Sequence, residues 1–592
     1  MCGIFGYFDQ LNMEIPTPTL EKMALSIQHR GPDGLGLYKE PGVALGNQRL
    51  SILDLENGWQ PFISEDKRVI VVQNGEIFNH VELAQELKGS QYECKTHCDT
   101  EVILKLYERD GIDFIHRLNG MFAIAIYDKQ IDKLFLIRDR VGEKPLYYSY
   151  IDDRVVFASE IKSILQSDID KKVCYDALDT YLTYNYVTPP LTLFKNIKHV
   201  MPGHYLEISK SGVEVSCWWD LAKITPVEKS EGEWISEFNH ILRDAVSIRL
   251  RSDVPFGAFL SGGVDSSTVV GLMSQMVDTQ VKTYTIGFNE KQYDESPFAL
   301  TAAKRFSTEH TAEIVESNML SLWRDVIYHC DQPHGDVSFM PTLKVAELAS
   351  RDVKVVLTGD GADELFAGYD KYKTFFSDES MFSCESEFFH SKYLDNISLF
   401  TGQTKDELYL PKTKGKITNA ASKALLDDLL DKSVHMGRIN QALYVDTLLL
   451  LSGNNLVKPD RMGMAVSIEN RAPFLDYRVI ELAFSMPGEL KLKDGETKSI
   501  YKKAVAELIG EDLAYRKKQM FTVPVGEWLK CELKELVTDL LLSDDSMVTG
   551  LLDKDCIENM YNLHCLGTEN YTREIRAIMA LEIWLREFQP EL

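Results

Sequence analysis

The stretch FLSGGVDSSTVV, residues 259–270, places two glycines, an acid and several hydroxyls between two apolar runs. Gly262 and Gly263 can adopt backbone angles closed to other residues, so several N–H groups can converge there on an anion. Asp265 would repel a phosphate unless a metal ion stood between them, so the loop predicts a phosphate that carries Mg²⁺. Hydroxyl donors for phosphate oxygens are available from Ser261, Ser266 and Ser267.

A second reactive group stands at the start of the chain, in the opening MCGIFGYF. Removal of Met1 would give Cys2 both a thiol and a free α-amine. Because an α-amine has a pKa of about 7.7–8.0, part of it is neutral near pH 7 and can take the thiol proton. Cys2 is therefore a candidate N-terminal nucleophile that serves as its own base.

Length and composition limit the class of protein. A chain of 592 residues exceeds what one hydrophobic core usually organises, so two or more domains are expected. The net charge of −26 argues against nucleic-acid binding. No run approaches the ~20 apolar residues of a membrane span, and no secretory signal pattern opens the chain. With ten cysteines scattered outside any dense framework, these features favour a cytoplasmic protein without membrane partners.

The apolar pattern predicts the elements that position these groups. Residues 254–260 are typical of a buried strand and residues 267–277 of a helix, with the phosphate loop between them. A polar, charged segment over 220–234 separates a strand-rich N-terminal part from a C-terminal part that begins β-α-β and ends mostly helical. We predict an N-terminal domain over 2–215, a linker over 216–232 and a second domain over 233–592.

Several motifs together carry a resemblance to a known family. SGGVDSS resembles the loop of the ATP pyrophosphatases, which cleave ATP between the α and β phosphates. The motifs MCGIFG, GNQRLSILDL, VQNGEIFNH and HCDTEVIL resemble those of class II glutamine amidotransferase domains. In combination, the whole chain resembles the glutamine-hydrolysing asparagine synthetases. Taken alone, each motif also has a structural interpretation, such as a serine-capped turn or a solvated acidic loop.

The resemblance implies a fold of mixed α/β and α+β class in two domains. The first would be an αββα nucleophile-hydrolase sandwich, and the second a parallel-sheet ATP-pyrophosphatase domain with a helical C-terminus. Glutamine would be held by Arg49 at its α-carboxylate and by Asp99 at its α-ammonium, with Asn74 and Glu76 as further glutamine-binding residues. Asn74 and the N–H of Gly75 would stabilise the oxyanion formed when Cys2 attacks.

In the second domain, the stretch VKVVLTGDGADELFAGYDKY predicts a strand that ends in an acidic loop. By the resemblance, Asp363 of this loop joins Asp265 on Mg²⁺, and Leu260 and Ile286 border the adenine. The other ATP-binding residues would be Ser261, Gly262, Gly263, Ser266, Gly359 and Asp360.

Two further expectations rest on the family pattern. Lys518 would neutralise charge on the phosphates, although Lys517 beside it is an alternative. Asp360 would take a catalytic role where the best-known members have Glu, and FTVP at 521–524 is a second departure. Arg471 and Asp476 are interpreted as structural.

The implied reaction is ATP-driven amidation of a carboxylate through an acyl-adenylate, with glutamine as the nitrogen donor. L-aspartate would give L-asparagine, with release of AMP, pyrophosphate and glutamate, and an internal tunnel would carry the ammonia. Two alternatives remain open: another carboxylate, such as a cell-wall, polysaccharide or natural-product precursor, or a non-catalytic protein that binds nucleotide or glutamine. A homodimer is compatible with the resemblance, but the sequence does not determine the oligomeric state.

Overall fold

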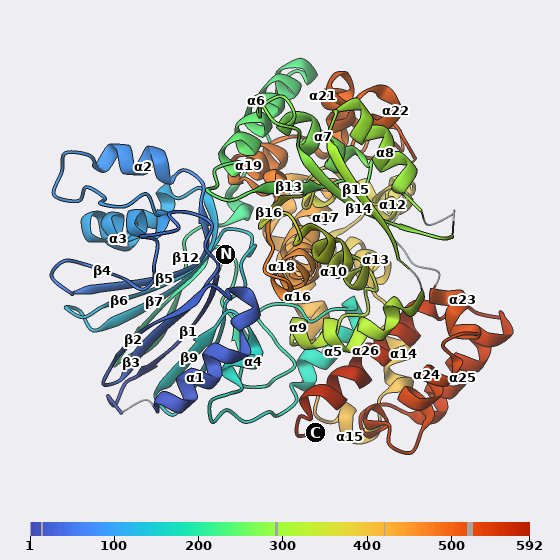
Figure 1. Cartoon of the computed structure of the whole chain (residues 1–592). Coiled ribbons are helices and arrows are strands. Elements are labelled where there is room, and N and C mark those ends of the chain that lie inside the picture. Colours follow the sequence, from blue (N-terminus) through green and yellow to red (C-terminus); the bar gives the residue numbers. More distant parts are fainter. Residues whose placement is uncertain (1, 14–15, 291–293, 316, 419–420, 518–524) are drawn as a thin grey trace.

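The computed structural model describes residues 2–13, 16–290, 294–315, 317–418, 421–517 and 525–592. A sandwich of strands with helices on its outer faces forms the N-terminal part, and a parallel sheet surrounded by helices forms the rest (Figure 1). Over the residues that the structure describes, no helix is both long and apolar enough to cross a membrane.

The sandwich consists of two antiparallel sheets of six strands each. The first has the order β10 (Lys198–His199), β8 (Tyr147–Ile151), β9 (Arg154–Ala158), β1 (Cys2–Asp9), β3 (Val43–Arg49) and β2 (Gly34–Glu40). The second has the order β12 (Gly212–Cys217), β11 (His204–Ser209), β7 (Lys133–Arg138), β6 (Gly120–Asp128), β5 (Val69–Ile77) and β4 (Phe62–Ile63).

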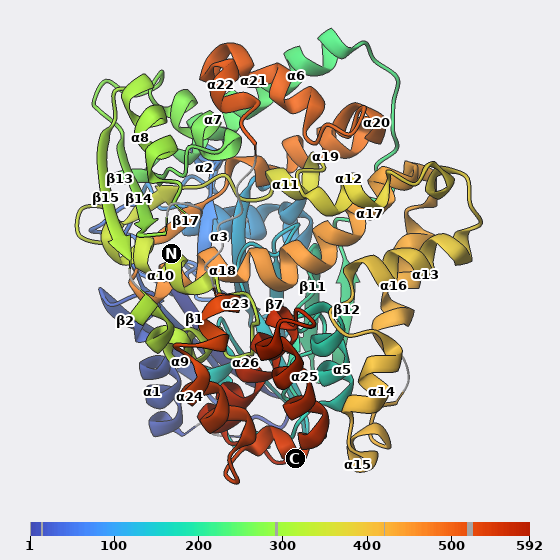
Figure 2. The same ribbon diagram turned by 90° about the vertical axis from the view of Figure 1, so that its right-hand side faces the viewer.

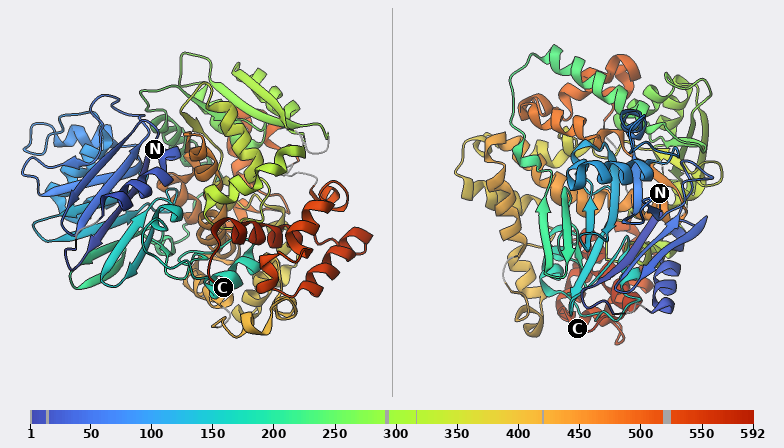
Figure 3. Two further views of the ribbon diagram at one scale, coloured as in Figure 1. Left: turned by 60° about the horizontal axis from the view of Figure 1, so that its bottom comes forward. Right: turned by 90° about the vertical axis from the view of Figure 1, so that its left-hand side faces the viewer.

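Helices cover both outer faces of the sandwich. The first sheet packs against α1 (Thr17–Ser26) and α4 (Ile161–Ile164), and the second against α2 (His80–Leu87) and α3 (Asp99–Asp110) (Figure 3). In β6 the alternation of side chains serves both faces, because Ala123 lies between the sheets while Phe122 and Ile124 pack in the cluster beside α3. The predicted four-layer αββα arrangement is therefore confirmed.

The segment predicted as linker, 216–232, overlaps a strand and a helix at its two ends. Strand β12 continues to Cys217, and helix α6 begins at Glu231, inside the segment predicted to be linker. The Ser230 side chain and the Glu233 carboxylate cap the first turn of α6 reciprocally. Trp234 on this helix has no exposed surface, so the second core begins here.

The second part is built on a parallel sheet of five strands. Its order is β15 (Glu309–Val315), β14 (Lys282–Phe288), β13 (Phe256–Phe259), β16 (Val355–Leu357) and β17 (Glu469–Arg471). Because β13 lies between β14 and β16, the loops that follow these three strands meet at one edge of the sheet. The predicted parallel-sheet domain is confirmed.

Helices make up the remainder, with the last ones gathered at one end of the molecule (Figure 2). Those before the last parallel strand are α5 (Tyr175–Tyr184), α6 (Glu231–Arg249), α7 (Val264–Met273), α8 (Ser296–Arg305), α9 (Trp323–Cys330), α10 (Phe339–Ala349), α11 (Ala362–Leu365), α12 (Asp370–Phe375), α13 (Ser386–Ile397), α14 (Gly402–Leu408), α15 (Pro411–Lys414), α16 (Ala421–Lys432), α17 (Arg438–Asp446), the π-helix η7 (Thr447–Asn455) and α18 (Val457–Ala465). Those after it are α19 (Tyr477–Ser485), α20 (Gly488–Lys491), α21 (Ser499–Ile509), α22 (Glu511–Ala514), α23 (Val525–Lys530), α24 (Lys534–Val537), α25 (Lys554–Leu566) and α26 (Thr572–Phe588).

Asp476 joins three segments at the contact between the two parts. Its carboxylate accepts from the backbone N–H of Arg478 at 3.1 Å, which caps α19, and from Arg249 Nη1 on α6 at 3.0 Å. It also accepts from Asn119 Nδ2 of the sandwich at 2.9 Å. Asp476 has no exposed surface, so these contacts hold a buried charge in place.

We predict that Asp476→Ala destabilises the protein strongly, because it leaves the buried Arg249 guanidinium without its carboxylate. Breaking a buried pair of this kind costs roughly 3–5 kcal/mol. The midpoint of thermal unfolding measures the effect. Asp244→Ala is the control, since Asp244 pairs with Arg478 at the surface, where an ion pair contributes little. Equal losses in the two variants would contradict this role of Asp476.

Candidate active sites

Cys2 is the first residue of β1 and is almost fully buried. Its backbone nitrogen donates to Asn74 Oδ1 on β5 at 3.2 Å, so the residues predicted as nucleophile and oxyanion donor are in direct contact. Gly75 follows with φ +144°, and a Cβ there would lie 2.0 Å from the carbonyl oxygen of Met121, so only glycine fits. The sheets thus bring Cys2, Asn74 and Gly75 to one place.

Arg49 lies directly opposite Cys2 in the pairing of β1 with β3. Its guanidinium is held by the segment that follows, donating to the carbonyl oxygens of Asp54 at 2.8 Å and Leu55 at 3.2 Å. The ring of Trp59 lies 4.7 Å from it. Arg49 therefore stands beside the nucleophile, in a position fixed by the backbone of a loop.

Asp99 and Glu76 complete the predicted glutamine-binding set. Asp99 is the first residue of α3, and its carboxylate accepts from the N–H of Ile77 at 2.9 Å and from Gln73 Nε2 at 3.0 Å. Burial raises the pKa of the Glu76 carboxyl well above its usual range, and the charge of Asp99 raises it further. Glu76 Oε1 has no hydrogen-bond partner among the described residues, so it can accept a donor from a ligand.

The predicted phosphate loop follows β13 and opens α7. Gly262 has φ +70°, and a Cβ there would lie 2.3 Å from the backbone carbon of Phe298, so the turn requires glycine. Ser261 and Ser266 approach each other at 3.1 Å between their hydroxyl oxygens. The N–H of Gly263 donates to Ser261 Oγ at 3.3 Å.

The two residues predicted to border adenine, Leu260 and Ile286, are buried at the carboxyl ends of neighbouring strands. Leu260 follows β13 directly, and its N–H donates to the carbonyl of Tyr284 on β14 at 3.0 Å. Gly359 lies in the loop after β16, and a Cβ there would lie 2.7 Å from the Cβ of Asp265. The sheet edge therefore gathers all the described residues predicted to bind ATP.

Asp265 and Asp363, the predicted metal ligands, both pair with the ammonium group of Lys498. Lys498 Nζ lies 2.7 Å from Asp265 Oδ1 and 2.7 Å from Asp363 Oδ1. Two carboxylates that converge on a single positive group suit a hard divalent cation, whose preferred ligands are carboxylate oxygens. The sequence did not indicate Lys498, because its partners come from segments more than a hundred residues away.

Asp360 belongs to the same loop as Asp363 but contacts other groups. Its carboxylate accepts from Thr358 Oγ1 at 2.7 Å. Burial raises the pKa of Asp360; Asp265 and Asp363 raise it further, while the positive charge of Lys458 on α18 opposes the shift. Lys458 Nζ in turn donates to Ser338 Oγ at 3.2 Å.

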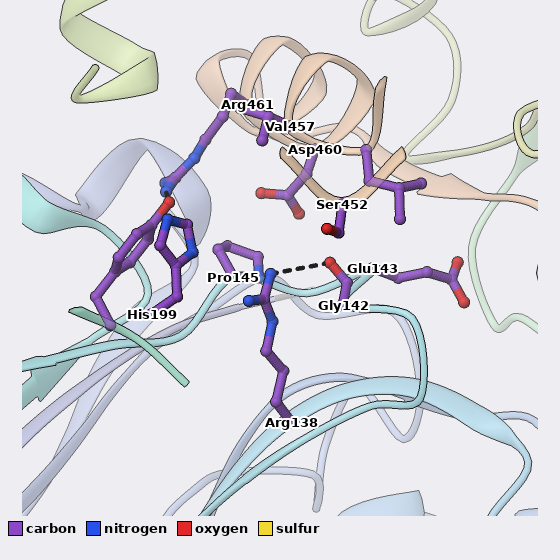
Figure 4. A pocket seen from close by; sticks show the side chains of 11 residues that line it. Arg138, Gly142, Glu143, Pro145, His199, Ser452, Val457, Asp460 and Arg461 are labelled. Carbon is purple, nitrogen blue, oxygen red and sulfur yellow. Dashed lines mark hydrogen bonds between the residues drawn. The ribbon is translucent and has the colours of Figure 1, made fainter. Parts of the chain in front are cut away.

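Two small cavities lie between the sandwich and the second part, each with space for about one water-sized molecule. In the first, Asp460 and Arg461 extend from α18 on one side, and Arg138 extends from the sandwich on the other, with Gly142 and Glu143 beside it (Figure 4). The second shares Glu143 and Asp460 with the first and extends to Asp360. The second cavity therefore lies next to the first and borders the acidic loop.

Comparisons with known proteins bear on both sites. Residues 237–586 match the family model for asparagine synthase, and residues 1–219 match the glutamine amidotransferase domain. The first match covers more than half of the chain. The chain belongs to the asparagine synthase family.

Relatives match along nearly the whole chain. The chain is 32% identical over 616 residues to glutamine-hydrolyzing asparagine synthetase 1 of Bacillus subtilis, with 99% of this chain and 96% of that protein covered. It is 30% identical over 593 residues to asparagine synthetase 3 of the same organism, with 95% and 93% covered. Amidase chyE of Penicillium rubens is 28% identical over 624 residues, with 91% and 92% covered. The chain is therefore a glutamine-dependent ligase of the asparagine synthase type.

Part of the predicted site lies outside the described residues. Lys518 and the departure at 521–524 belong to this part, whereas Lys517 is described and exposed. The choice between Lys517 and Lys518 stays a prediction.

We predict that Lys498→Met makes the protein depend on Mg²⁺ for stability, because the two carboxylates lose their shared cation. The midpoint of thermal unfolding should fall without metal and recover by several degrees when Mg²⁺ is added in the absence of ATP. Lys502→Met is the control, because Lys502 lies in the first turns of α21, the helix that begins directly after Lys498, but pairs with Glu496. A midpoint of Lys498→Met that does not recover when Mg²⁺ is added would contradict a cation site between Asp265 and Asp363.

Proposed function

We propose that the chain converts L-aspartate, glutamine and ATP into L-asparagine, glutamate, AMP and pyrophosphate in the cytoplasm. The observation that carries the proposal is the acidic loop after β16. At one end of this loop, Asp363 pairs with Lys498, which also pairs with Asp265 of the phosphate loop. At the other end, Asp360 lines a cavity that borders the sandwich. Activation of a carboxylate and delivery of ammonia can therefore meet at one loop.

At the first site, the Cys2 thiol would attack the side-chain amide carbon of glutamine after Met1 is removed, and its own α-amine would take the proton. Asn74 and the N–H of Gly75 would donate to the oxyanion. The Cys2 nitrogen contacts Asn74 Oδ1, and the Asn74 amide nitrogen, which donates one N–H to Ser159 Oγ at 3.5 Å, has a second N–H for the oxyanion. Arg49 would hold the α-carboxylate of glutamine and Asp99 its α-ammonium, with Glu76 as a further contact.

At the second site, the phosphate loop would hold ATP, with Leu260 and Ile286 against the adenine. Asp265 and Asp363 would hold Mg²⁺, which neutralises charge on the departing pyrophosphate when it is bound. Lys518 would add positive charge at the α-phosphate. The carboxylate of the acceptor would attack that phosphorus, so pyrophosphate leaves and an acyl-adenylate forms.

Ammonia would reach the acyl-adenylate through the cavities at the interface, whose size suits a water-sized molecule. Burial and the neighbouring charge of Asp139 raise the pKa of Glu143 to about 8, so this lining residue is mostly neutral at pH 7. Asp360 lies where the second cavity meets the loop and would accept the proton that the attacking ammonia loses.

The groups around Asp360 support a small amino acid as acceptor. Lys458 offers an ammonium for a carboxylate, with Ser338 beside it, and Asp336 adds a buried carboxylate near the same lysine. A zwitterion with a second carboxylate needs groups of both signs, and this cluster has them. Asp360 in place of Glu, the segment 521–524 and the amidase relative keep another carboxylate as the second candidate.

We predict that Cys2→Ala loses glutamine-dependent synthesis by several orders of magnitude, because the nucleophile is gone. AMP formation with added ammonium salt should remain, since the second site is separate. Amino-acid and nucleotide analysis of the same reactions measures both. Cys217→Ala, at an exposed cysteine, is the control. Glutamate release by Cys2→Ala at the wild-type rate would rule out Cys2 as the nucleophile.

We predict that aspartate, glutamine and ATP with Mg²⁺ give equal amounts of AMP and asparagine. AMP is expected because the phosphate loop surrounds the leaving pyrophosphate, so the bond broken lies between the α and β phosphorus atoms. The same measurement is repeated with other amino-acid and polysaccharide carboxylates. ADP as product would refute the acyl-adenylate, and AMP formation that responds only to another carboxylate would refute aspartate.

A further inference from the structure

Arg30 connects the nucleophile of the first site to a helix of the second part. It lies in the turn Gln28–Arg30 and has no exposed surface. Its Nε donates to the carbonyl oxygen of Cys2 at 3.2 Å. Nη1 and Nη2 donate to the two carboxylate oxygens of Asp460 on α18, at 2.9 and 3.1 Å. One guanidinium thus binds Cys2 and α18 at the same time.

The pair belongs to a wider buried network of charges at the interface. Arg30 Nη1 also donates to Glu160 Oε1 at 2.9 Å, and Arg461, the neighbour of Asp460, lies 2.8 Å from the same carboxylate. Lys162 pairs with Asp331 at 2.9 Å. Such buried networks add little net stability, but breaking one partner costs several kcal/mol, so they fix geometry. Helix α18 is therefore held firmly to the segment that carries Cys2.

The same helix also reaches the acidic loop of the second site. Lys458, two residues before Asp460, carries a positive charge that lowers the pKa of Asp360. Residues two apart on a helix point roughly 200° away from each other, so Lys458 and Asp460 face opposite sides of α18. Lys458 acts on the acidic loop, while Asp460 binds Arg30 and also lines the cavity that reaches Asp360.

The segment before α18 gives a second contact with that loop. The π-helix η7 leads into α18, and its last residue, Asn455, donates to Glu364 Oε1 at 2.6 Å. Glu364 follows Asp363 in the acidic loop. π-Helices are rare and often occur at functional sites. We therefore expect η7 to change its conformation when the acidic loop binds a ligand. A shift of α18 would act on the carbonyl of Cys2 through Asp460 and Arg30.

We propose that Arg30 and Asp460 form a positioning pair that makes glutamine hydrolysis at Cys2 respond to nucleotide and acceptor at the second site. The inference rests on the proposed function, because it needs a bound acceptor and ATP. Occupation of the acidic loop moves or steadies α18, and the pair sets the orientation of Cys2 relative to Asn74. Glutamine is then hydrolysed mainly when an acyl-adenylate is available.

The test compares the rate of glutamate release with and without ATP, Mg²⁺ and aspartate. In the wild type we expect stimulation of about fivefold or more, the lower end of typical coupling between sites. Asp460→Asn keeps the shape of the side chain but removes its charge, and we expect stimulation below about twofold. AMP formation from ammonium salt should stay within about threefold of the wild type.

Two further variants separate positioning from folding. Arg30→Lys keeps a buried positive charge but cannot bond Cys2 and both oxygens of Asp460 together, so it should also lose the stimulation. Asp476→Asn weakens another buried contact between the two parts, and should lower the unfolding midpoint without changing the stimulation.

The outcomes distinguish this inference from the proposed function. If the wild type forms AMP but the variants at Asp460 and Arg30 keep its full stimulation, the inference is wrong and the proposed function stands. Wild-type glutamine hydrolysis that ignores ATP and aspartate while AMP is formed would overturn it equally. If the wild type forms no AMP from aspartate with either nitrogen source, the proposed function fails, and the inference fails with it.

Discussion

A guanidinium with no contact to solvent, that of Arg30, binds the two parts of the chain together at the point where the first site begins. This matters because ammonia released into water is protonated and can no longer attack a carbonyl. The two sites must therefore face each other across a closed interface. Buried ion pairs serve this purpose well, since their geometry is strict even where their net contribution to stability is small.

The parallel sheet supplies the other half of the arrangement. The loops after β13 and β16 place Asp265 and Asp363 around the ammonium group of Lys498. Asp360, in the loop after β16, lines the cavity at the interface. Three acids near one another would repel, and Lys498 and Lys458 offset this repulsion. Charge balance in the site therefore depends on helices that lie far along the chain from the loops.

The sequence indicated the parts of the site that are local. Gly262, Gly263 and Asp265 stand within one turn, and their types alone indicate an anion and a metal, whereas Cys2 is marked by its place at the chain start. The class of fold followed from the resemblance, and the sheets of the structure agree with it. The capping box at Ser230 was also readable, yet the segment around it was predicted as linker.

The groups that the sequence did not indicate have distant partners. Lys498 meets Asp265 across more than two hundred residues, and Arg30 meets Asp460 across more than four hundred, so no local pattern could reveal either pair. The π-helix at Thr447–Asn455 was equally hidden, because its apolar residues suit an ordinary helix. These features depend on contacts between residues far apart in the sequence and cannot be predicted from local helix propensity.

Isotope transfer tests the central claim, that ammonia passes inside the protein between two coupled sites, most directly. Glutamine labelled with ¹⁵N at its amide is mixed with the wild-type protein, ATP, Mg²⁺, aspartate and unlabelled ammonium salt in excess over the glutamine. The account predicts that, at saturating glutamine, most of the asparagine carries ¹⁵N in its side-chain amide despite the unlabelled pool. Asparagine whose ¹⁵N content follows the ammonia in solution would contradict it.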